Sequence, residues 1–159
     1  MTTLETRLAA LEHEVAALRA DRDIRTVLSQ YAVGVDEKHP HVLWPLFTDD
    51  AVIEVPAWSV EVRGIDAVMR FFENYWRRFD NPRRYYANEV VTVTGDTASA
   101  FMYWHVTQEE GADSVLGWGT YDWGFRRQGG QWLIAREVVH IRAMTTLARG
   151  WAGQGTMSL

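Results

Sequence analysis

A tyrosine and an aspartate near the N-terminus are the first residues in this sequence that could do acid–base chemistry. Tyr31 and Asp36 are five residues apart, which on an ideal α-helix separates their side chains by about 140°. They face one site only if the helix ends between them, and Gly34 is a residue at which a helix can end. In an apolar pocket the pKa of Asp36 would be raised, as a general base working near neutral pH requires. The alternative is that Asp36 caps a loop and Tyr31 belongs to the core.

Two further candidates lie near the C-terminus, on the last expected strand. His140 and Arg142 are two residues apart, so their side chains point to the same face of a strand. In a pocket, Arg142 would be a fixed cation that binds a carboxylate or stabilises an enolate-like oxyanion, and His140 would be an acid or a base. On a solvated face, Arg142 would instead pair with an acidic residue, and His140 would be a rim or core residue.

Polar side chains also occur at every second position in the middle of the chain. Arg84, Tyr86 and Asn88 alternate along an expected strand and would present a cation, a phenol and an amide on one face. His105 shares a face with Tyr103, opposite Trp104. It is therefore either a second proton carrier in the pocket or a residue of the outer face.

Tryptophan is unusually abundant, with 8 among 159 residues. A pocket lined by several indole rings would favour a flat or ring-containing ligand, whereas in the core the same rings would only fill space. The candidates for a pocket wall are Trp44, Trp58, Trp104 and Trp118.

Composition narrows the classes of function. The net charge of −5 disfavours a nucleic-acid binder, and no apolar run is long enough for a membrane span. There is no cysteine, and among the 5 histidines only His39 and His41 are close together, so no metal site is expected. Phosphate-binding and dinucleotide-binding fingerprints are missing, which predicts no cofactor. Glu5, Arg7 and Glu12 interrupt the apolar residues of the N-terminus, so no signal peptide is expected and the cytoplasm is the predicted location.

The first 20 residues carry a leucine pattern that predicts an amphipathic helical arm. Leu4, Leu8, Leu11, Val15 and Leu18 recur at alternating spacings of four and three, which places them along one seam of a helix. Thr2 and Glu5 form a capping-box pattern at its start. We expect this arm, residues 1–20, to pack on a partner subunit; the alternative is a frayed helix.

The elements that follow predict an α+β domain over residues 21–145 and a C-terminal tail over 146–159. Helices come first and long antiparallel strands afterwards. This order is typical of an α+β fold and not of an α/β fold, in which strands and helices alternate. In the tail, Leu147 and Trp151 could fold back over the sheet. The expected helices cover residues 23–35 and 65–79, with a short helix between them that carries Leu43, Leu46 and Phe47 and is stopped by residues 48–50. The expected strands cover residues 51–55, 60–62, 85–94, 97–107, 115–127 and 131–143, and a polar loop is expected at 108–113.

Several phrases of the sequence carry a resemblance to a known family. They are DIRTVLSQYAVGVDEKHPHVLWPLFTDDAVIEV, the helix start at Gly64-Ile65, ANEVVTVTGDTASAFMYW, and the Gly-Gly-Gln-Trp-Leu-Ile run at 129–134. In this order and spacing they resemble the SnoaL-like branch of the nuclear transport factor 2 superfamily, over about residues 20–143. The resemblance implies a cone of helices and a curved sheet with a pocket at its open end. That fold is used by dehydratases, isomerases, cyclases, epoxide hydrolases, dehydrohalogenases and binding-only proteins, so it does not by itself give a function.

Within this superfamily the chain most resembles the bile acid 7α-dehydratase type, which also has a leucine-patterned N-terminus. The resemblance places Tyr31 and Asp36 on the family's first-helix Tyr and Asp, and Arg142 on its last-strand Arg. The chain departs from that pattern in two places. It has Arg84 to Asn88 where relatives carry a His before an Asn, and Val106 where the bile acid enzyme has an Asp. The bile acid substrate is therefore not carried over.

The sequence thus predicts a cofactor-independent lyase acting on a small, apolar, ring-containing or aromatic substrate. Asp36 or a histidine would take a proton, Tyr31 would donate to the leaving oxygen, and Arg142 with Arg84 would stabilise the negative charge. Loss of water is the first expectation; a retro-aldol loss of formaldehyde, as in relatives from the catabolism of lignin-derived aromatic compounds, uses the same groups. An isomerase or polyketide-type cyclase, and a non-catalytic binding module, remain alternatives. We expect a homodimer or higher homo-oligomer, formed through the outer sheet face and the arm.

Overall fold

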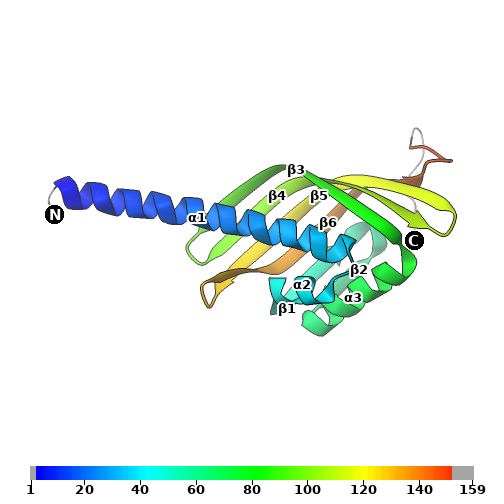
Figure 1. The fold of residues 1–159 in the computed structure, drawn as a ribbon, viewed down its shortest axis with the longest axis horizontal. Helices are drawn as coiled ribbons and strands as arrows, with labels where there is room; N and C mark the ends of the chain where they lie inside the picture. Colours follow the sequence, from blue (N-terminus) through cyan, green and yellow to red (C-terminus); the bar gives the residue numbers. More distant parts are fainter. Residues whose placement is uncertain (1–2, 152–159) are drawn as a thin grey trace.

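The computed structural model describes residues 3–151 and confirms the predicted α+β class. One curved sheet of six strands has the order β2-β1-β6-β5-β4-β3, and the helices lie along one side of it (Figure 1). All neighbouring strands are antiparallel except β1 and β6, which are parallel. The helices are α1 (Thr3–Asp36), α2 (Pro40–Leu43), η1 (Trp44–Leu46), η2 (Pro56–Trp58) and α3 (Ile65–Arg78); the strands are β1 (Phe47–Val55), β2 (Val60–Arg63), β3 (Asp80–Thr94), β4 (Thr97–Glu110), β5 (Asp113–Gln128) and β6 (Gln131–Thr146).

The first helix differs from the prediction, because the arm and the second expected helix are one continuous helix of 34 residues. The expected interruption between them contains neither Gly nor Pro, and an ion pair between Asp21 and Arg25, one turn apart, links the two parts. Gly34 does not end the helix. It lies in the last turn, where a Cβ atom would come within 3.1 Å of the Leu43 Cβ, so glycine allows α2 to approach α1 closely.

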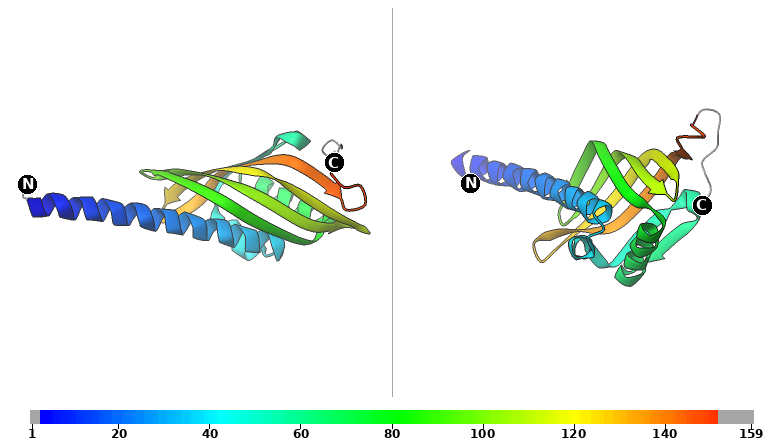
Figure 2. Two further views of the ribbon diagram at one scale, coloured as in Figure 1. Left: turned by 90° about the horizontal axis from the view of Figure 1, so that it is seen from above. Right: turned by 45° about the vertical axis from the view of Figure 1, so that its right-hand side comes forward.

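The two halves of α1 have different surroundings. The C-terminal half buries Ile24, Leu28 and Tyr31 against the sheet, whereas the N-terminal half extends beyond it and leaves its leucines exposed (Figures 1 and 2). Of the predicted capping box, Thr2 lies outside the described residues. None of the described helices combines the length and the apolar content needed to cross a bilayer.

Four boundaries of the prediction were wrong by several residues. The strand expected from residue 85 is β3, which begins at Asp80. The short helix expected up to residue 47 is divided into α2 and η1, and Phe47 to Asp50 already belong to β1. The polar loop expected at 108–113 is mostly strand, because β4 continues to Glu110 and turns at Gly111. The last strand continues to Thr146.

The end of the described chain folds back only in part. The Leu147 amide donates to the Ser114 carbonyl, but the Leu147 side chain is exposed. Trp151 packs edge-to-face on Trp118, with 5.6 Å between ring centroids. The rest of the predicted tail, residues 152–159, lies outside the described part of the chain.

Two β-bulges in β6 decide which residues face the helices. The pairing with β5 shifts register between Gly124 and Phe125 and again between Trp118 and Gly119. Ile134 faces the core, then the first shift reverses the alternation, so that the inward residues become Glu137, Val139 and Ile141. The second shift restores it at Met144. A bulge inserts one unpaired residue and therefore moves the following side chains to the opposite face.

Candidate functional site

A narrow cavity lies between the helices and the concave face of the sheet. Its volume is about 60 Å³, and most of its wall is apolar. Since a cavity of about 150 Å³ is what accommodates benzene, side chains must move apart before a ring can enter. The lining residues are Tyr31, Val35, Val55, Trp58, Phe71, Phe72, Tyr75, Arg84, Trp104, Val106, Gln108, Tyr121, Glu137, Val139, Ile141 and Met144.

The most unusual group in this wall is the carboxyl of Glu137, which is 1% exposed. Its Oε1 accepts a hydrogen bond of 2.7 Å from the Tyr31 hydroxyl, and its Oε2 is buried with no partner among the described residues. Burial raises the pKa of Glu137 from 4.5 to about 7, against the opposing effects of the Tyr31 hydrogen bond and the Arg84 charge. Glu137 can therefore exchange a proton near neutral pH.

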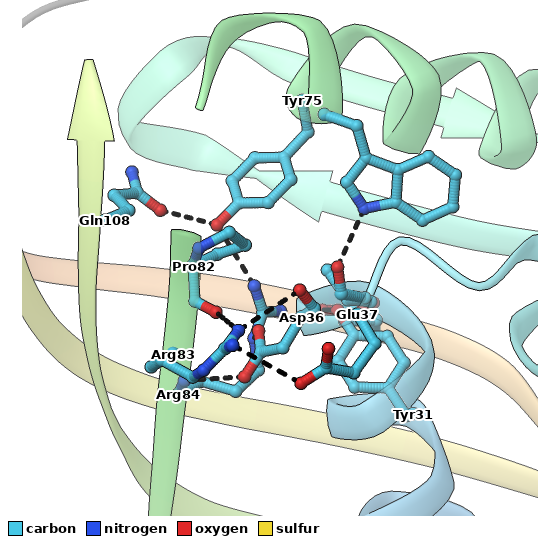
Figure 3. Close-up of polar contacts among 11 residues, drawn as sticks. Tyr31, Asp36, Glu37, Tyr75, Pro82, Arg83, Arg84 and Gln108 are labelled. Atoms are coloured by element: carbon cyan, nitrogen blue, oxygen red, sulfur yellow. Dashed lines mark hydrogen bonds and ion pairs between the residues drawn. The ribbon is translucent and has the colours of Figure 1, made fainter. Parts of the chain in front are cut away.

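A buried ion pair lies at the end of the first helix (Figure 3). The Nε of Arg84 lies 2.7 Å from Oδ1 of Asp36, and the backbone amide of Arg84 donates to Oδ2 at 2.8 Å. Both side chains are nearly buried, with 6% and 10% exposed. Because both oxygens of Asp36 are occupied by Arg84, and Asp36 is not among the lining residues, this carboxylate orients the guanidinium group rather than reaching into the cavity.

The guanidinium begins a chain of hydrogen bonds along the cavity wall. Nη2 of Arg84 donates to the Tyr75 hydroxyl at 3.1 Å, and that hydroxyl donates to Oε1 of Gln108 at 2.5 Å (Figure 3). The guanidinium carbon also lies 5.9 Å from the ring centre of Tyr31 and 5.6 Å from that of Tyr75. Tyr75 and Gln108 are thus held in place by a buried positive charge.

The remaining phenols of the site are hydrogen-bond donors rather than bases. Burial raises the pKa of Tyr31, Tyr86 and Tyr121, so that they stay protonated at neutral pH. The Tyr86 hydroxyl is buried and has no partner in the described chain, and its ring contacts that of Tyr121 with 5.8 Å between centroids.

Half of the predicted site residues are at or beside the cavity. Tyr31, Arg84, Trp58 and Trp104 line it. Asp36 lies behind Arg84, and Tyr86 packs on the lining residue Tyr121. The Tyr31 hydroxyl donates a hydrogen bond to Glu137, so in this structure its proton is already engaged.

The three residues predicted as proton carriers or as the cation on β4 and β6 do not line the cavity. His105 is on the exposed face of β4, where the strict alternation turns Trp104 inward. His140 and Arg142 do share a face, but the first bulge of β6 turns it outward; His140 pairs there with Asp122 at 2.8 Å, and Arg142 is exposed.

Three predicted substrate-binding residues also lie elsewhere. Asn88 has a positive φ of 60° in a bulge of β3 between Ala87 and Val90, so its exposed side chain does not follow Arg84 and Tyr86 inward. Trp44 is 39% exposed in η1. Trp118 packs on Trp151 instead of lining the cavity.

Sequence reasoning missed Glu137, Tyr75, Gln108 and Tyr121 as site residues. Gln108 had a readable signal, because it continues the buried alternation of Met102, Trp104 and Val106. Glu137 had none, since the alternation counted from Ile134 puts it on the outer face. No group of three or more His, Cys, Asp or Glu side chains within residues 3–151 could hold a metal ion.

Comparison with known proteins assigns the family. The family model described as the SnoaL-like domain matches residues 16–137. The chain belongs to the SnoaL-like domain family. Its fold is therefore the nuclear transport factor 2-like fold predicted from the sequence. A search of curated proteins finds no significant match to this SnoaL-like chain.

Solved structures share this fold at low sequence identity. A type 2 hexachlorocyclohexane dehydrochlorinase, LinA, superposes with a TM-score of 0.80 at 18% identity, covering 91% of this chain and 99% of its own. LinA-type3 from Novosphingobium barchaimii LL02 gives 0.77 at 21% identity, covering 92% and 99%. A putative scytalone dehydratase from Novosphingobium aromaticivorans DSM 12444 gives 0.75 at 19% identity, covering 87% and 97%. These comparisons do not confirm the finer resemblance to bile acid 7α-dehydratases.

Proposed function

We propose that this SnoaL-like protein is a cofactor-independent lyase in which Glu137 removes a proton from carbon. The observation that carries the proposal is a buried carboxyl in the wall of an apolar cavity, with a pKa of about 7 and one oxygen that has no partner within residues 3–151. A general base works best when its pKa is close to the working pH. The base is thus Glu137, and not Asp36 or a histidine as expected from the sequence.

The arrangement supports an elimination in which one carboxyl acts twice. Oε2 of Glu137 takes a proton from the substrate, the electrons of that C–H bond form the new double bond, and the bond to the leaving oxygen breaks. The protonated Glu137 then gives the proton to the leaving oxygen, so that water departs and the carboxylate is restored. Tyr31 holds Oε1 throughout, and the charge of Arg84 favours the carboxylate form of Glu137.

The relatives by structure fit this class of reaction. One is named as a dehydrochlorinase and another as a putative scytalone dehydratase; both names describe eliminations. The apolar, ring-rich wall favours a small ring-containing substrate. An isomerase would use the same proton abstraction but return the proton to another carbon, so the reaction products decide between the two.

The test is incubation of the purified protein with cyclic β-hydroxy carbonyls, hydroxysteroids and aromatic 1,3-diols in H₂O and in D₂O, followed by mass spectrometry. Loss of water is the expected result. Loss of formaldehyde would replace dehydration by a retro-aldol reaction, and deuterium uptake at unchanged composition would indicate an isomerase. Tight binding of a compound without any turnover or deuterium uptake would contradict the proposal and leave a binding module.

Tyr31→Phe is expected to shift the pH dependence of the reaction upward. The variant removes the hydrogen bond that stabilises the Glu137 carboxylate, so the pKa of Glu137 rises further, by about 1 pH unit for a bond to a charged group. The measurement is the rate of proton abstraction from pH 5 to pH 10. Tyr103→Phe, which makes the same change on the exposed face of β4, is the control. An unchanged midpoint in Tyr31→Phe would remove Tyr31 from the mechanism.

A further inference from the structure

Two buried N–H donors of the cavity have no acceptor among the described residues. They are Nε2 of Gln108 and Nε1 of Trp58, and both residues line the cavity. A buried donor without an acceptor costs about 1–3 kcal/mol, so such groups are normally matched by water or by a ligand. Two of them in one apolar cavity indicate an acceptor atom on the molecule that binds there.

The orientation of the Gln108 amide follows from its neighbours. The Tyr75 hydroxyl accepts from Arg84, which has only donors, and must therefore use its own proton for Gln108. The amide atom at 2.5 Å from that hydroxyl is then the oxygen, and the amino group is turned away from Tyr75 (Figure 3). The donor without an acceptor is thus fixed in place by a chain that starts at a buried cation.

The charges of the site favour an uncharged ligand. Arg84 is the cation among the described lining residues, and Asp36 neutralises it at 2.7 Å. Glu137 adds a negative charge when it is ionised. A carboxylate substrate would be repelled by Glu137 and would find no free cation, whereas a carbonyl oxygen needs only N–H donors.

We propose that Gln108 and Trp58 form a subsite for the carbonyl oxygen of an uncharged substrate. The inference rests on the proposed function, and it names the substrate class: a ring compound whose ketone or aldehyde group makes the neighbouring C–H bond acidic. Removal of that proton by Glu137 moves electron density onto the carbonyl oxygen, where the two N–H groups stabilise it. The leaving group is then on the carbon next to the one that loses its proton.

The test compares the binding of three small probes by ligand NMR titration: cyclohexanone, methylenecyclohexane of the same shape, and cyclohexanecarboxylate. We expect the native protein to prefer the ketone over the hydrocarbon by about tenfold, from one to two hydrogen bonds, and to bind the carboxylate weakest. In Gln108→Leu and in Trp58→Phe the preference for the ketone should fall at least threefold. Trp58→Phe keeps an aromatic ring, so it remains informative if Gln108→Leu does not fold.

Trp104→Phe is the matched control. Trp104 lines the same cavity, but its Nε1 already donates to the Thr120 carbonyl at 3.2 Å. Trp104→Phe should therefore weaken the binding of cyclohexanone and of methylenecyclohexane equally. A ketone preference that survives in both Gln108→Leu and Trp58→Phe would overturn the subsite. Glu137→Gln should keep the preference. A subsite intact in that variant, together with no turnover of any ketone by the native protein, would refute the lyase alone.

A second inference comes from the exposed seam of α1, which is independent of the cavity. The side chains of Leu4, Leu8, Leu11, Val15 and Leu18 are 43–76% exposed. At 100° per residue, this seam lies roughly opposite Ile24, Leu28 and Tyr31, which pack on the sheet. The described body of the same chain therefore does not cover the seam. The N-terminal part of α1 extends beyond the sheet (Figure 2), so a second arm can pack on it.

We infer that the seam pairs in parallel with the seam of a second copy of this chain. In a parallel coiled coil the flanking residue before one core position faces the residue five places further along the partner. This sets Arg7 against Glu12 and Glu14 against Arg19, both of opposite charge. An antiparallel pair near the centre of the seam would keep two kinds of attractive pair, Glu5 with Arg19 and Arg7 with Asp21. It would also set Glu12 against Glu12 and Glu14 against Glu14, which repel each other, so the parallel pair is favoured because all its flanking pairs attract.

The orientation can be tested cleanly because the chain has no cysteine. Leu18→Cys should form a disulfide-linked dimer on mild oxidation, since identical core positions meet in a parallel pair; His13→Cys, on the outer side of the arm, should not. In sedimentation experiments, Leu11→Asp should have a lower assembly mass than the native protein. The dimer of Glu12→Arg should dissociate at a higher protein concentration than the native dimer, and the double variant Arg7→Glu/Glu12→Arg should restore the native affinity. A native size unchanged by Leu11→Asp, or no cross-link at Leu18→Cys, would overturn the pairing.

Discussion

Glu137→Gln should lower turnover by about 10²–10⁴-fold while the protein stays folded, because the substitution removes the one group proposed to accept the substrate proton. The amide oxygen of Gln still accepts the hydrogen bond of 2.7 Å from Tyr31, so the side chain keeps its place. The group at the position of Oε2 becomes a donor and can no longer take a proton. The measurement is kcat/KM, or the rate of deuterium exchange, for the compound that the native protein converts.

The matched control is Glu61→Gln. It makes the same chemical change in an exposed residue of β2, where Glu61 only pairs with Arg63 on the surface. Its activity should equal that of the native protein. If Glu137→Gln remained within a few-fold of native activity, the base would have to be sought elsewhere and the proposed mechanism would fail.

Asp36 provides a contrast to Glu137 that explains why the sequence and the structure point to different carboxyls. Both residues are acidic, and the family resemblance favoured Asp36. In the structure Asp36 is occupied by the side chain and the backbone of Arg84, whereas Glu137 has a buried oxygen without a partner among residues 3–151. A sequence shows which acidic residues exist, but the base is selected by long-range partners, here across 48 and 106 positions of the chain.

Much of the fold could be read from the sequence, because strand alternation, the helix pattern of α3 and the turns are local signals. The faces of the strands could be read only where alternation is unbroken, as in β4. In β3 and β6 the bulges change the face of Asn88 and of His140, and nothing in the local sequence announces them. The candidate site was therefore half predicted: Tyr31 of α1 and Trp104 of β4 line the cavity as expected, whereas His105 of β4 and both predicted residues of β6 do not.

The native protein should lose about 3 kcal/mol of stability from Glu137 as the pH rises from acidic to basic. The pKa of this carboxyl is raised from 4.5 to about 7 on folding, so the folded chain holds the proton more tightly than the unfolded chain. The contribution is fully present below about pH 4.5, decreases between pH 4.5 and 7, and is lost above pH 7. Glu137→Gln cannot ionise, so it should be more stable than the native protein at pH 8.

Urea unfolding at several pH values, from 5 to 8, measures this effect for the native protein, Glu137→Gln and Glu61→Gln. Subtracting the free energy of unfolding of Glu137→Gln from that of the native protein cancels the contribution of the titrating groups that the two proteins share. This difference should change by roughly 2–3 kcal/mol from pH 5 to pH 8, whereas the free energy of unfolding of Glu61→Gln should follow the native curve. A difference that does not depend on pH would mean that Glu137 is ionised with an ordinary pKa in the folded protein.

The two effects of Glu137 must report one folded-state pKa, since the same deprotonation produces both. The carboxylate that makes the enzyme active is the form that burial disfavours, so activity should reach half its maximum near pH 7, where the decline in stability that begins near pH 4.5 ends. Tyr31→Phe should move the midpoint of activity and the upper end of the stability decline upward together. If the rate and the stability gave different values for this pKa, the base that limits the rate would not be the buried carboxyl, even if Glu137→Gln were inactive.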